Sequence, residues 1–254
     1  MGNWDRKAEA YKMAIEHTQA MREDYKEEIA TCIEKSIIYG GPNRKPTPFM
    51  PSMGGVTKQG VVKLKTDEAL FKYGGDGLTI LLNFASYKNP GGKFIEGAMA
   101  QEEALCHASY LFNVLGAFVD YYNWNDQHKN NALYTDRAIY TPGVRFFDNM
   151  GNTKFASVLT CAAPNRSVML RYGGSTEMDN LRCLESRVKF IRDIIAEQRP
   201  STIILGAWGC GVFKQDANVV SRLLGEAFEN IGGTVIYAIP DDRNYDIFLN
   251  SLRG

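Results

Sequence analysis

The sequence predicts an α/β fold in which a largely parallel β-sheet is sandwiched between helices. The run Leu78–Ala85 reads LTILLNFA and is almost entirely apolar, which is typical of a central strand buried on both faces. From this run onwards, predicted strands alternate with predicted helices. Thr176–Gln198 has the apolar spacing of a long amphipathic helix, and Pro200 follows as a stop signal.

The first sixty residues have a different character. Residues 4–29 predict an amphipathic helix, and Thr31–Tyr39 predicts a strand. The segment Tyr39–Gly60 is rich in proline and glycine, so we expect it to be irregular. We therefore expect residues 1–60 to form a helical extension and a Pro/Gly-rich segment packed on a core of residues 61–254. The helical stripe consists of Trp4, Ala8, Tyr11, Ile15, Thr18, Tyr25 and Ile29.

The remaining elements follow from the same patterns of periodicity and turn signals. Strands are predicted at Val61–Lys65, Arg137–Tyr140, Val144–Phe147, Phe155–Ala162, Thr202–Leu205 and Thr234–Ile239, with a Thr141-Pro142-Gly143 turn between the second and third of these. Helices are predicted at Gln101–Tyr122, Gln215–Ile231 and Tyr245–Leu252.

Composition and charge exclude several classes of protein. Lys+Arg and Asp+Glu are both 29, so the formal net charge is zero, which argues against general binding to nucleic acid or an anionic membrane. No apolar run reaches the roughly 18 residues of a membrane span, and the N-terminus lacks the apolar core of a secretory signal. The five cysteines are widely spaced, without C-x-x-C or zinc-ligand spacing to a histidine. We expect reduced thiols in a cytoplasmic protein, with no metal and no cofactor.

The segment Asn89–Cys106, NPGGKFIEGAMAQEEALC, carries the strongest indication of chemistry. Its glycines follow the Leu78–Ala85 strand and allow a backbone to approach a phosphate or sugar closely, because no Cβ intervenes. The adjacent acids Glu102 and Glu103 stand at the start of a predicted helix. Paired carboxyl groups can protonate and hydrolyse a glycosidic bond, although acids are also common in a helix's first turn for their favourable effect on the helix dipole.

A second glycine-bearing loop, Gly206–Phe213, follows the predicted strand Thr202–Leu205. In open α/β sheets, ligands bind beyond the carboxyl ends of the strands, so the two loops can meet at one crevice. Neither loop fits G-x-G-x-x-G or the P-loop pattern. Each loop alone is explained by tight turns, but both loops beside Gln-Glu-Glu favour a site for a sugar-phosphate ligand.

The segment resembles the microbial type of poly(ADP-ribose) glycohydrolase, a family with the macrodomain fold. The family hallmark is a glycine triplet, a short spacer and Gln-Glu-Glu, and Gln101-Glu102-Glu103 match in full. Further blocks occur in the family's order and cover most of the chain after residue 60, and the N-terminal helix with His17-Thr18 looks like the family's extension. These blocks are Asn83-Phe84-Ala85-Ser86, Ile139-Tyr140-Thr141-Pro142 with Val144 and Phe147, Ala162-Ala163-Pro164-Asn165 and Leu205–Phe213.

The resemblance implies a macrodomain-like catalytic core that cleaves ribose–ribose O-glycosidic bonds of poly(ADP-ribose) and releases ADP-ribose. It implies that Glu103 is the catalytic acid/base and that Glu102 and Gln101 support ribose binding. The loop Gly209–Val212 would contact the diphosphate through backbone N–H groups, and Phe213, if not merely a core aromatic, would pack near the distal ribose. The implied substrate-binding residues are Asn83, Gly91, Gly92, Gln101, Gly209, Cys210, Gly211, Val212 and Phe213.

The chain departs from the family pattern at two places. Lys93 stands where the family usually has a third glycine, and its ammonium either pairs with a phosphate or is a solvated surface charge. Lys214-Gln215-Asp216-Ala217 replaces the Gly-Asn-Asp-Pro of relatives. Cys106 and His107 lie one turn past Glu103 but do not face each other on a helix, so we interpret Cys106 as core and His107 as exposed or near the site.

Three other functions stay open at the level of sequence. One is removal of single ADP-ribose groups from a protein or nucleobase, and another is binding of ADP-ribose without catalysis. A third, a Rossmann-type nucleotide-dependent enzyme, lacks its fingerprint here. In each ADP-ribose case the partner is ADP-ribose, or an ADP-ribosylated protein or polymer.

Overall fold

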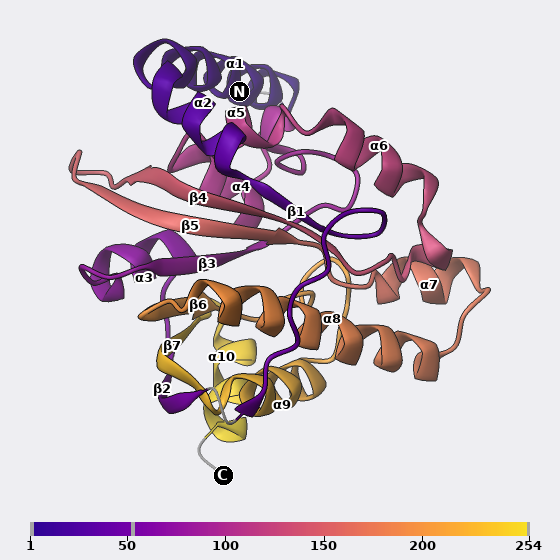
Figure 1. Cartoon of the computed structure of the whole chain (residues 1–254). Helices are drawn as coiled ribbons and strands as arrows, with labels where there is room; N and C mark the ends of the chain where they lie inside the picture. Colours follow the sequence, from indigo (N-terminus) through magenta and orange to yellow (C-terminus); the bar gives the residue numbers. More distant parts are fainter. Residues whose placement is uncertain (1–2, 52–53, 253–254) are drawn as a thin grey trace.

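The structure is a computed structural model that describes residues 3–51 and 54–252. The described residues form one seven-stranded sheet with helices on both faces (Figure 1). The strands are β1 (Ile37–Gly40), β2 (Gly55–Val62), β3 (Thr79–Phe84), β4 (Arg137–Phe147), β5 (Thr153–Cys161), β6 (Thr202–Leu205) and β7 (Ile231–Ala238). The helices are α1 (Asn3–Asp24), α2 (Lys26–Lys35), α3 (Thr66–Tyr73), α4 (Gln101–His107), α5 (Leu111–Leu115), α6 (Val119–Gln127), α7 (Arg166–Tyr172), α8 (Glu177–Gln198), α9 (Ala217–Phe228) and α10 (Asp242–Ser251), with 3₁₀ turns η2 (Phe94–Glu96) and η3 (Asn130–Ala132).

The strand order is β1-β4-β5-β3-β6-β7-β2. The pairs from β5 through β3, β6 and β7 to β2 are parallel, whereas β4 is antiparallel to both β5 and β1. The predicted mixed, largely parallel sheet is therefore confirmed. Because β3 and β6 are neighbours and parallel, the loops that follow them leave the same edge of the sheet.

Residues of the central strand alternate between two hydrophobic cores. Ile80 and Leu82 of β3 pack into the core under α8 and α9, whereas Leu81 packs into the core under α2 to α5. All three side chains are fully buried, and each such burial contributes roughly 1.5–3 kcal/mol relative to exposure. This two-sided burial explains the uninterrupted apolar run of the strand.

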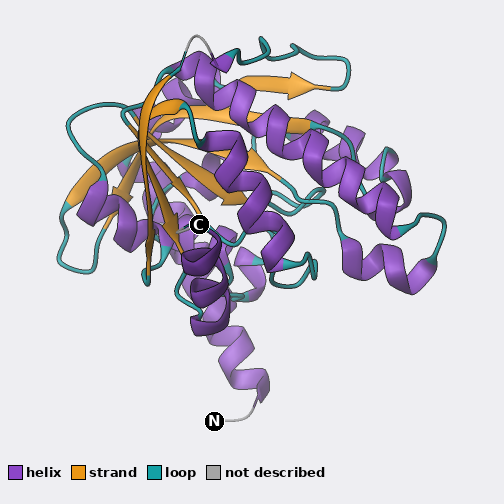
Figure 2. Cartoon of the chain, turned by 90° about the horizontal axis from the view of Figure 1, so that it is seen from below, coloured by secondary structure: helices purple, strands orange, loops and turns teal. Residues whose placement is uncertain are grey.

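The N-terminal part differs from its prediction in two respects. The helix breaks at Tyr25, and α2 then continues to Lys35, so the predicted strand Thr31–Tyr39 is reduced to β1. The expected apolar stripe is also out of phase, because Tyr11 is 54% exposed and Ile15 is 40% exposed, while Ala14 is fully buried. Helix α1 lies so close to the loop around η2 that only small side chains fit on the face of α1 that meets this loop. The first turns of α1 project away from the sheet (Figure 2).

The predicted helix Gln101–Tyr122 is three helices, α4, α5 and α6. The Ser109 hydroxyl donates to the carbonyl of Leu105 at 2.6 Å and accepts from the N–H of Leu111 at 3.0 Å, which ends one helix and begins the next. The two predicted strands Arg137–Tyr140 and Val144–Phe147 are one strand, β4, because the Thr-Pro-Gly sequence forms a bulge between Thr141 and Val144 rather than a turn. Helices α3 and α7 were not predicted.

The segment between residues 39 and 60 is tied to the body of the molecule. Its middle part runs along α8, where the N–H groups of Thr47 and Phe49 donate to Glu197 and Asp193. Strand β2 begins at Gly55, earlier than the predicted strand Val61–Lys65, and the proposed boundary after residue 60 falls within it. The division into residues 1–60 and 61–254 stays a prediction.

A buried arginine joins the loops at the ligand edge of the sheet. Arg187 of α8 is 1% exposed, and its guanidinium donates to Asp136 Oδ1 at 2.5 Å and to the carbonyls of Ala162 and Leu133 at 2.6 and 3.3 Å. Asp136 and Ala162 flank β4 and β5, so this one side chain fixes the ends of two strands. The planar guanidinium is suited to holding three acceptors at once.

We predict that Arg187→Lys destabilises the fold although it conserves the charge. An ammonium cannot reach all three acceptors, so at least one buried carbonyl loses its partner, at a cost of about 1–3 kcal/mol. Urea unfolding followed by circular dichroism measures the loss, with Arg182→Lys as the control because the Arg182 side chain is 72% exposed. Equal stability of the two variants would contradict this role of Arg187.

Candidate active site

A cavity of about 410 Å³ lies at the edge of the sheet where β3 and β6 end. Its walls come from the ends of β3 and β7, the first turns of α3 and α4, and the loop after β6. Five of the predicted substrate-binding residues line it, namely Gln101, Gly209, Gly211, Val212 and Phe213. The cavity thus meets the loop after β6 and the start of α4, whereas the other predicted site residues do not line it, namely Asn83, Gly91, Gly92, Glu102, Glu103 and Cys210.

Glu102 lies beneath this crevice and is 3% exposed. Its Oε1 accepts a hydrogen bond from Asn83 Nδ2 at 3.2 Å, and its Oε2 accepts from the N–H of Ser86 at 2.7 Å. Burial raises the pKa of Glu102 from 4.5 to about 8, against the opposing effect of these hydrogen bonds. Asn83 is fully buried and also donates to Thr160, so it contacts the carboxyl group rather than the cavity.

Glu103 is also buried, at 6% exposure, but its two carboxyl oxygens differ. Oε1 accepts from the backbone N–H of Lys93 at 2.8 Å. Oε2 has no hydrogen-bond partner within the described part of the chain. Because a buried oxygen without a partner costs free energy, Oε2 is an acceptor that a ligand or water can satisfy.

Gly92 is the residue that allows both carboxyl groups to approach the loop. A Cβ at this position would lie 2.5 Å from Oε1 of Glu103 and 2.9 Å from Oε2 of Glu102. Its φ of +61° also lies in the left-handed region that favours glycine. Gly91, with φ +64°, has the same constraint from Phe112 and Cys106, whose nearest atoms would be 2.6 and 3.2 Å from an added Cβ.

Gln101 ties the start of α4 to the end of β3. Its Oε1 accepts from the N–H of Phe84 at 2.8 Å, and its Nε2 donates to the carbonyl of Leu82 at 2.9 Å and to Thr66 at 3.1 Å. The amide is thus engaged with the strand on which the site is built. Gln101 also lines the cavity, but its contact with a substrate stays a prediction.

The loop after β6 is held from below by buried side chains. Trp208 is fully buried and donates through Nε1 to the carbonyl of Cys161 at 3.0 Å. Gly209 has φ +78°, and an added Cβ would lie 2.8 Å from Ala163. Burial raises the pKa of the Cys210 thiol to about 12, so the thiol is a packing group, as the sequence indicated.

The second half of this loop is more exposed to solvent. Val212 is 78% exposed and Phe213 is half-buried, with its ring 6.2 Å from that of Tyr134 in a T-shaped contact. Tyr134 in turn stacks on Tyr87 at 4.0 Å. Phe213 therefore ends an aromatic row beside the cavity and also packs, partly buried, against the core under α8 and α9.

Lys93 needs no special backbone conformation. Its φ is −113°, which any residue adopts, and its ammonium pairs with Glu96 at 3.1 Å on the surface. The backbone N–H of Lys93 makes the contact to Glu103, and a lysine supplies it as well as a glycine. Cys106 is fully buried, as predicted, and His107 lies half-buried against Phe94, with ring centroids 4.5 Å apart.

Sequence reasoning missed two polar groups of the site. The N–H of Ser86 holds Glu102, and Oδ1 of Asp67, whose residue lines the cavity, is buried without a partner in the described residues. Burial also raises the pKa of Asp67. Asp67 lies in the first turn of α3, a helix that the Thr-Asp-Glu start and the Gly74 stop could have indicated.

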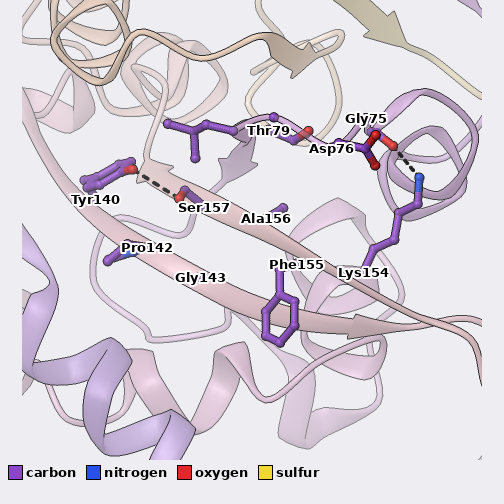
Figure 3. A pocket seen from close by; sticks show the side chains of 13 residues that line it. Gly75, Asp76, Thr79, Tyr140, Pro142, Gly143, Lys154, Phe155, Ala156 and Ser157 are labelled. Carbon is purple, nitrogen blue, oxygen red and sulfur yellow. Dashed lines mark hydrogen bonds between the residues drawn. The ribbon is translucent and has the colours of Figure 1, made fainter.

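A larger hollow of about 580 Å³ lies at the opposite edge of the sheet, where β3 and β5 begin (Figure 3). Tyr140 donates to Ser157 at 3.1 Å across its floor, and Lys154 donates to the carbonyl of Gly74 at its rim. None of the predicted site residues lines it, whereas five of them line the cavity where β3 and β6 end. Despite its size, we assign the site to the cavity at the edge with the carboxyl pair.

Residues 3–51 and 54–252 contain no cluster of three or more His, Cys, Asp or Glu side chains able to hold a metal ion. Within the same residues, no helix is both long enough and apolar enough to cross a membrane.

The sheet order, the cavity at the strand ends and the buried carboxyl pair define a macrodomain-type glycohydrolase. The family model described as "Microbial-type PARG, catalytic domain" matches residues 7–149, more than half of the chain. The chain belongs to this family, that of the microbial poly(ADP-ribose) glycohydrolases, and is a hydrolase.

Solved structures support the same placement. The poly(ADP-ribose) glycohydrolase of Thermomonospora curvata bound to the inhibitor ADP-HPD is 24% identical, with a TM-score of 0.81 over 96% of this chain and 99% of that one. The poly(ADP-ribose) glycohydrolase of Deinococcus radiodurans in complex with ADP-ribose is 28% identical, with a TM-score of 0.77 over 89% and 98% of the two chains. Among curated proteins, no sequence matches this chain.

We predict that Gly92→Ala abolishes most of the activity by displacing the two carboxyl groups. The added Cβ overlaps both of them, and the left-handed φ adds strain of about 1–2 kcal/mol. Gly151→Ala is the matched control, because φ is +80° there but nothing lies within 4 Å of an added Cβ. Both variants carry the strain of a left-handed φ, but Gly92→Ala also overlaps the carboxyl groups, so it should lose more stability and be the only one of the two to lose turnover of poly(ADP-ribose). Equal activity of the two variants would show that the carboxyl groups tolerate a side chain.

We predict that Glu102 makes the protein less stable as the pH rises from about 5 to 8. The folded state holds the Glu102 proton up to a pKa of about 8, whereas the unfolded chain releases it near 4.5, so folding becomes less favourable between these values. Glu102→Gln cannot titrate, and its melting temperature relative to wild type should rise across this range. Glu226→Gln on the surface is the control, and a parallel shift of both variants would rule out a buried, titrating Glu102.

Proposed function

We propose that Glu103 is the acid/base with which this glycohydrolase cleaves the ribose–ribose O-glycosidic bond of poly(ADP-ribose) and releases ADP-ribose. The observation that carries the proposal is the buried Oε2 of Glu103, which has no hydrogen-bond partner among the described residues, on a carboxyl group that lies against Gly92. Lys93 orients the carboxyl group through Oε1 and leaves Oε2 for the substrate.

In the first step, protonated Glu103 gives its proton to the ribose oxygen that leaves the anomeric carbon. The C–O bond breaks as oxocarbenium character develops on the remaining ribose. In the second step, the Glu103 carboxylate takes a proton from water, and the water oxygen bonds to the anomeric carbon. Glu103 thereby regains its proton, and no cofactor takes part.

Glu102 is suited to a supporting role and not to this proton transfer. Both of its oxygens already accept hydrogen bonds, from Asn83 and from Ser86. Its raised pKa keeps it protonated near neutral pH. A protonated Glu102 also has an O–H that can donate to a ribose hydroxyl, which agrees with a role in ribose binding.

The cavity suits the rest of an ADP-ribose unit. Gly209, Gly211 and Val212 line it, so their backbone N–H groups suit a diphosphate, and Phe213 offers an apolar face to the distal ribose. Asp67, on the wall formed by α3, has a carboxyl oxygen that suits the amino group of an adenine. The Tyr39–Gly60 segment contributes no described residue to this cavity.

The natural partner is then ADP-ribose as part of a polymer or of a modified protein, and the enzyme reverses ADP-ribosylation. The balanced charge gives no basis for general nucleic-acid binding. The cysteines of the described chain are free thiols, which supports a cytoplasmic location.

We predict that Glu103→Gln abolishes turnover and keeps ADP-ribose affinity within about tenfold, or ~1.4 kcal/mol. The amide preserves the shape and the Lys93 contact but cannot give or take the proton. Release of ADP-ribose from polymer measures turnover, and calorimetry measures binding. Glu96→Gln is the control, because Glu96 lies in the same loop but its side chain is 68% exposed.

The same assay separates the remaining alternatives. Wild type is incubated with the polymer and with mono-ADP-ribosylated protein, and the released product is identified. Release from the modified protein alone would indicate a mono-ADP-ribosyl hydrolase. Binding without release would indicate a reader. A Glu103→Gln variant that turns over at the wild-type rate would overturn the assignment of the acid.

A further inference from the structure

The N-terminal helix α1 contacts the segment that carries Glu103 at two places. We call residues 91–107 the loop–helix unit; it contains the glycine pair, η2 and α4. At the η2 end, α1 approaches so closely that a Cβ on Gly97 would lie 2.3 Å from Cβ of Ala10. At the far end, His17 Nε2 lies 3.1 Å from the carbonyl of Cys106 and 2.9 Å from that of Ser109.

The His17 contacts have a defined chemistry. Both acceptors are carbonyl oxygens, so Nε2 carries the proton and donates to them. Carbonyls at the end of a helix lack partners within it, and His17 supplies one at the end of α4.

The His17 side chain also lies near two parts of the structure that position Glu103, namely helix α4 and the backbone at Lys93. His107 stands one turn after Glu103 on α4, 6.3 Å from the His17 ring, and packs on Phe94. Phe94 follows Lys93, whose N–H holds Oε1 of Glu103, and it lies 6.0 Å from the His17 ring. The helix that bears Glu103 and the backbone that orients its carboxyl group therefore both rest on α1.

We propose that His17 is a positioning residue for Glu103, and that α1 thereby belongs to the catalytic apparatus. The proposal rests on Glu103 being the acid/base. His17 holds the end of α4 and the Phe94 ring, while Ala10 holds Gly97, so the loop–helix unit is clamped beside η2 and at the end of α4. A proton donor must be placed within a fraction of an ångström, and a 1 Å misplacement can reduce the rate about a hundredfold.

The test compares two substitutions at one position. His17→Phe keeps a ring against Phe94 and His107 but removes the donor, whereas His17→Gln keeps an N–H donor near the place of Nε2. We expect His17→Phe to lower kcat on poly(ADP-ribose) about 10- to 100-fold, with KM and the Kd for ADP-ribose changed less than about threefold. His17→Gln should restore kcat to within about threefold of wild type. Lys12→Ala, on the exposed side of α1, is the control and should leave kcat unchanged.

A second variant covers the case in which His17→Phe does not fold. Ala10→Val leaves His17 intact and adds methyl groups against Gly97, so it should lower kcat without weakening ADP-ribose binding. Wild-type kcat in either folded variant would overturn the clamp, as would a His17→Gln variant no more active than His17→Phe. If Glu103→Gln is inactive while these variants are fully active, only the clamp fails. If Glu103→Gln is active, both the proposed function and the clamp fail.

Discussion

Burial of two adjacent carboxyl groups is the constraint on which the arrangement of this site depends. Glu102 and Glu103 are almost withdrawn from water, and each such group requires hydrogen-bond donors to remain there. Asn83 and the N–H groups of Ser86 and Lys93 supply them. These donors come from the end of β3 and from the loop that follows it, so the strand, the loop and α4 must meet at one point. Glycine at position 92 follows directly, because any side chain would occupy the space of the carboxyl oxygens.

The same constraint separates the roles of two neighbouring residues of the same type. Successive residues on a helix point about 100° apart, so the two carboxyl groups meet different surroundings. Glu102 points to the strand end, where both of its oxygens are bonded and burial raises its pKa. Glu103 points to the glycine loop, where one oxygen is bonded and the other is not. One group is thus fixed and neutral, and the other is oriented with one oxygen unpaired, which agrees with the supporting and reacting roles proposed for them.

The sequence was sufficient wherever one local pattern determines the structure. Leu78–Ala85 and Thr176–Gln198 have strong periodicity and clear ends, and both match β3 and α8 closely. Prediction from the sequence failed where a tertiary contact determines the local structure. The inner face of α1 was misjudged because close packing on Gly97 favours Ala10 and Ala14 over larger apolar residues. The break at Ser109 depends on a side-chain hydroxyl that bonds the backbone on both sides. For the site, the motif indicated the carboxyl pair and both loops, but it could not show that Asn83 lies under Glu102 or that Asp67 faces the cavity.

The two departures from the family pattern follow from the same geometry. At position 93 the site requires an N–H directed at Glu103 and a φ that any residue adopts, so a lysine preserves the contact and its side chain pairs with Glu96 outside the site. At position 214 the backbone is left-handed, with φ +59°, and a residue other than glycine costs about 1–2 kcal/mol there. A hydrogen bond from Arg166 to the Lys214 carbonyl at 2.9 Å helps to hold this conformation, and the next residue, Gln215, is buried and bonded to Asn180 and Pro164. Both departures therefore leave the carboxyl pair buried and Glu103 bonded to the backbone of its loop.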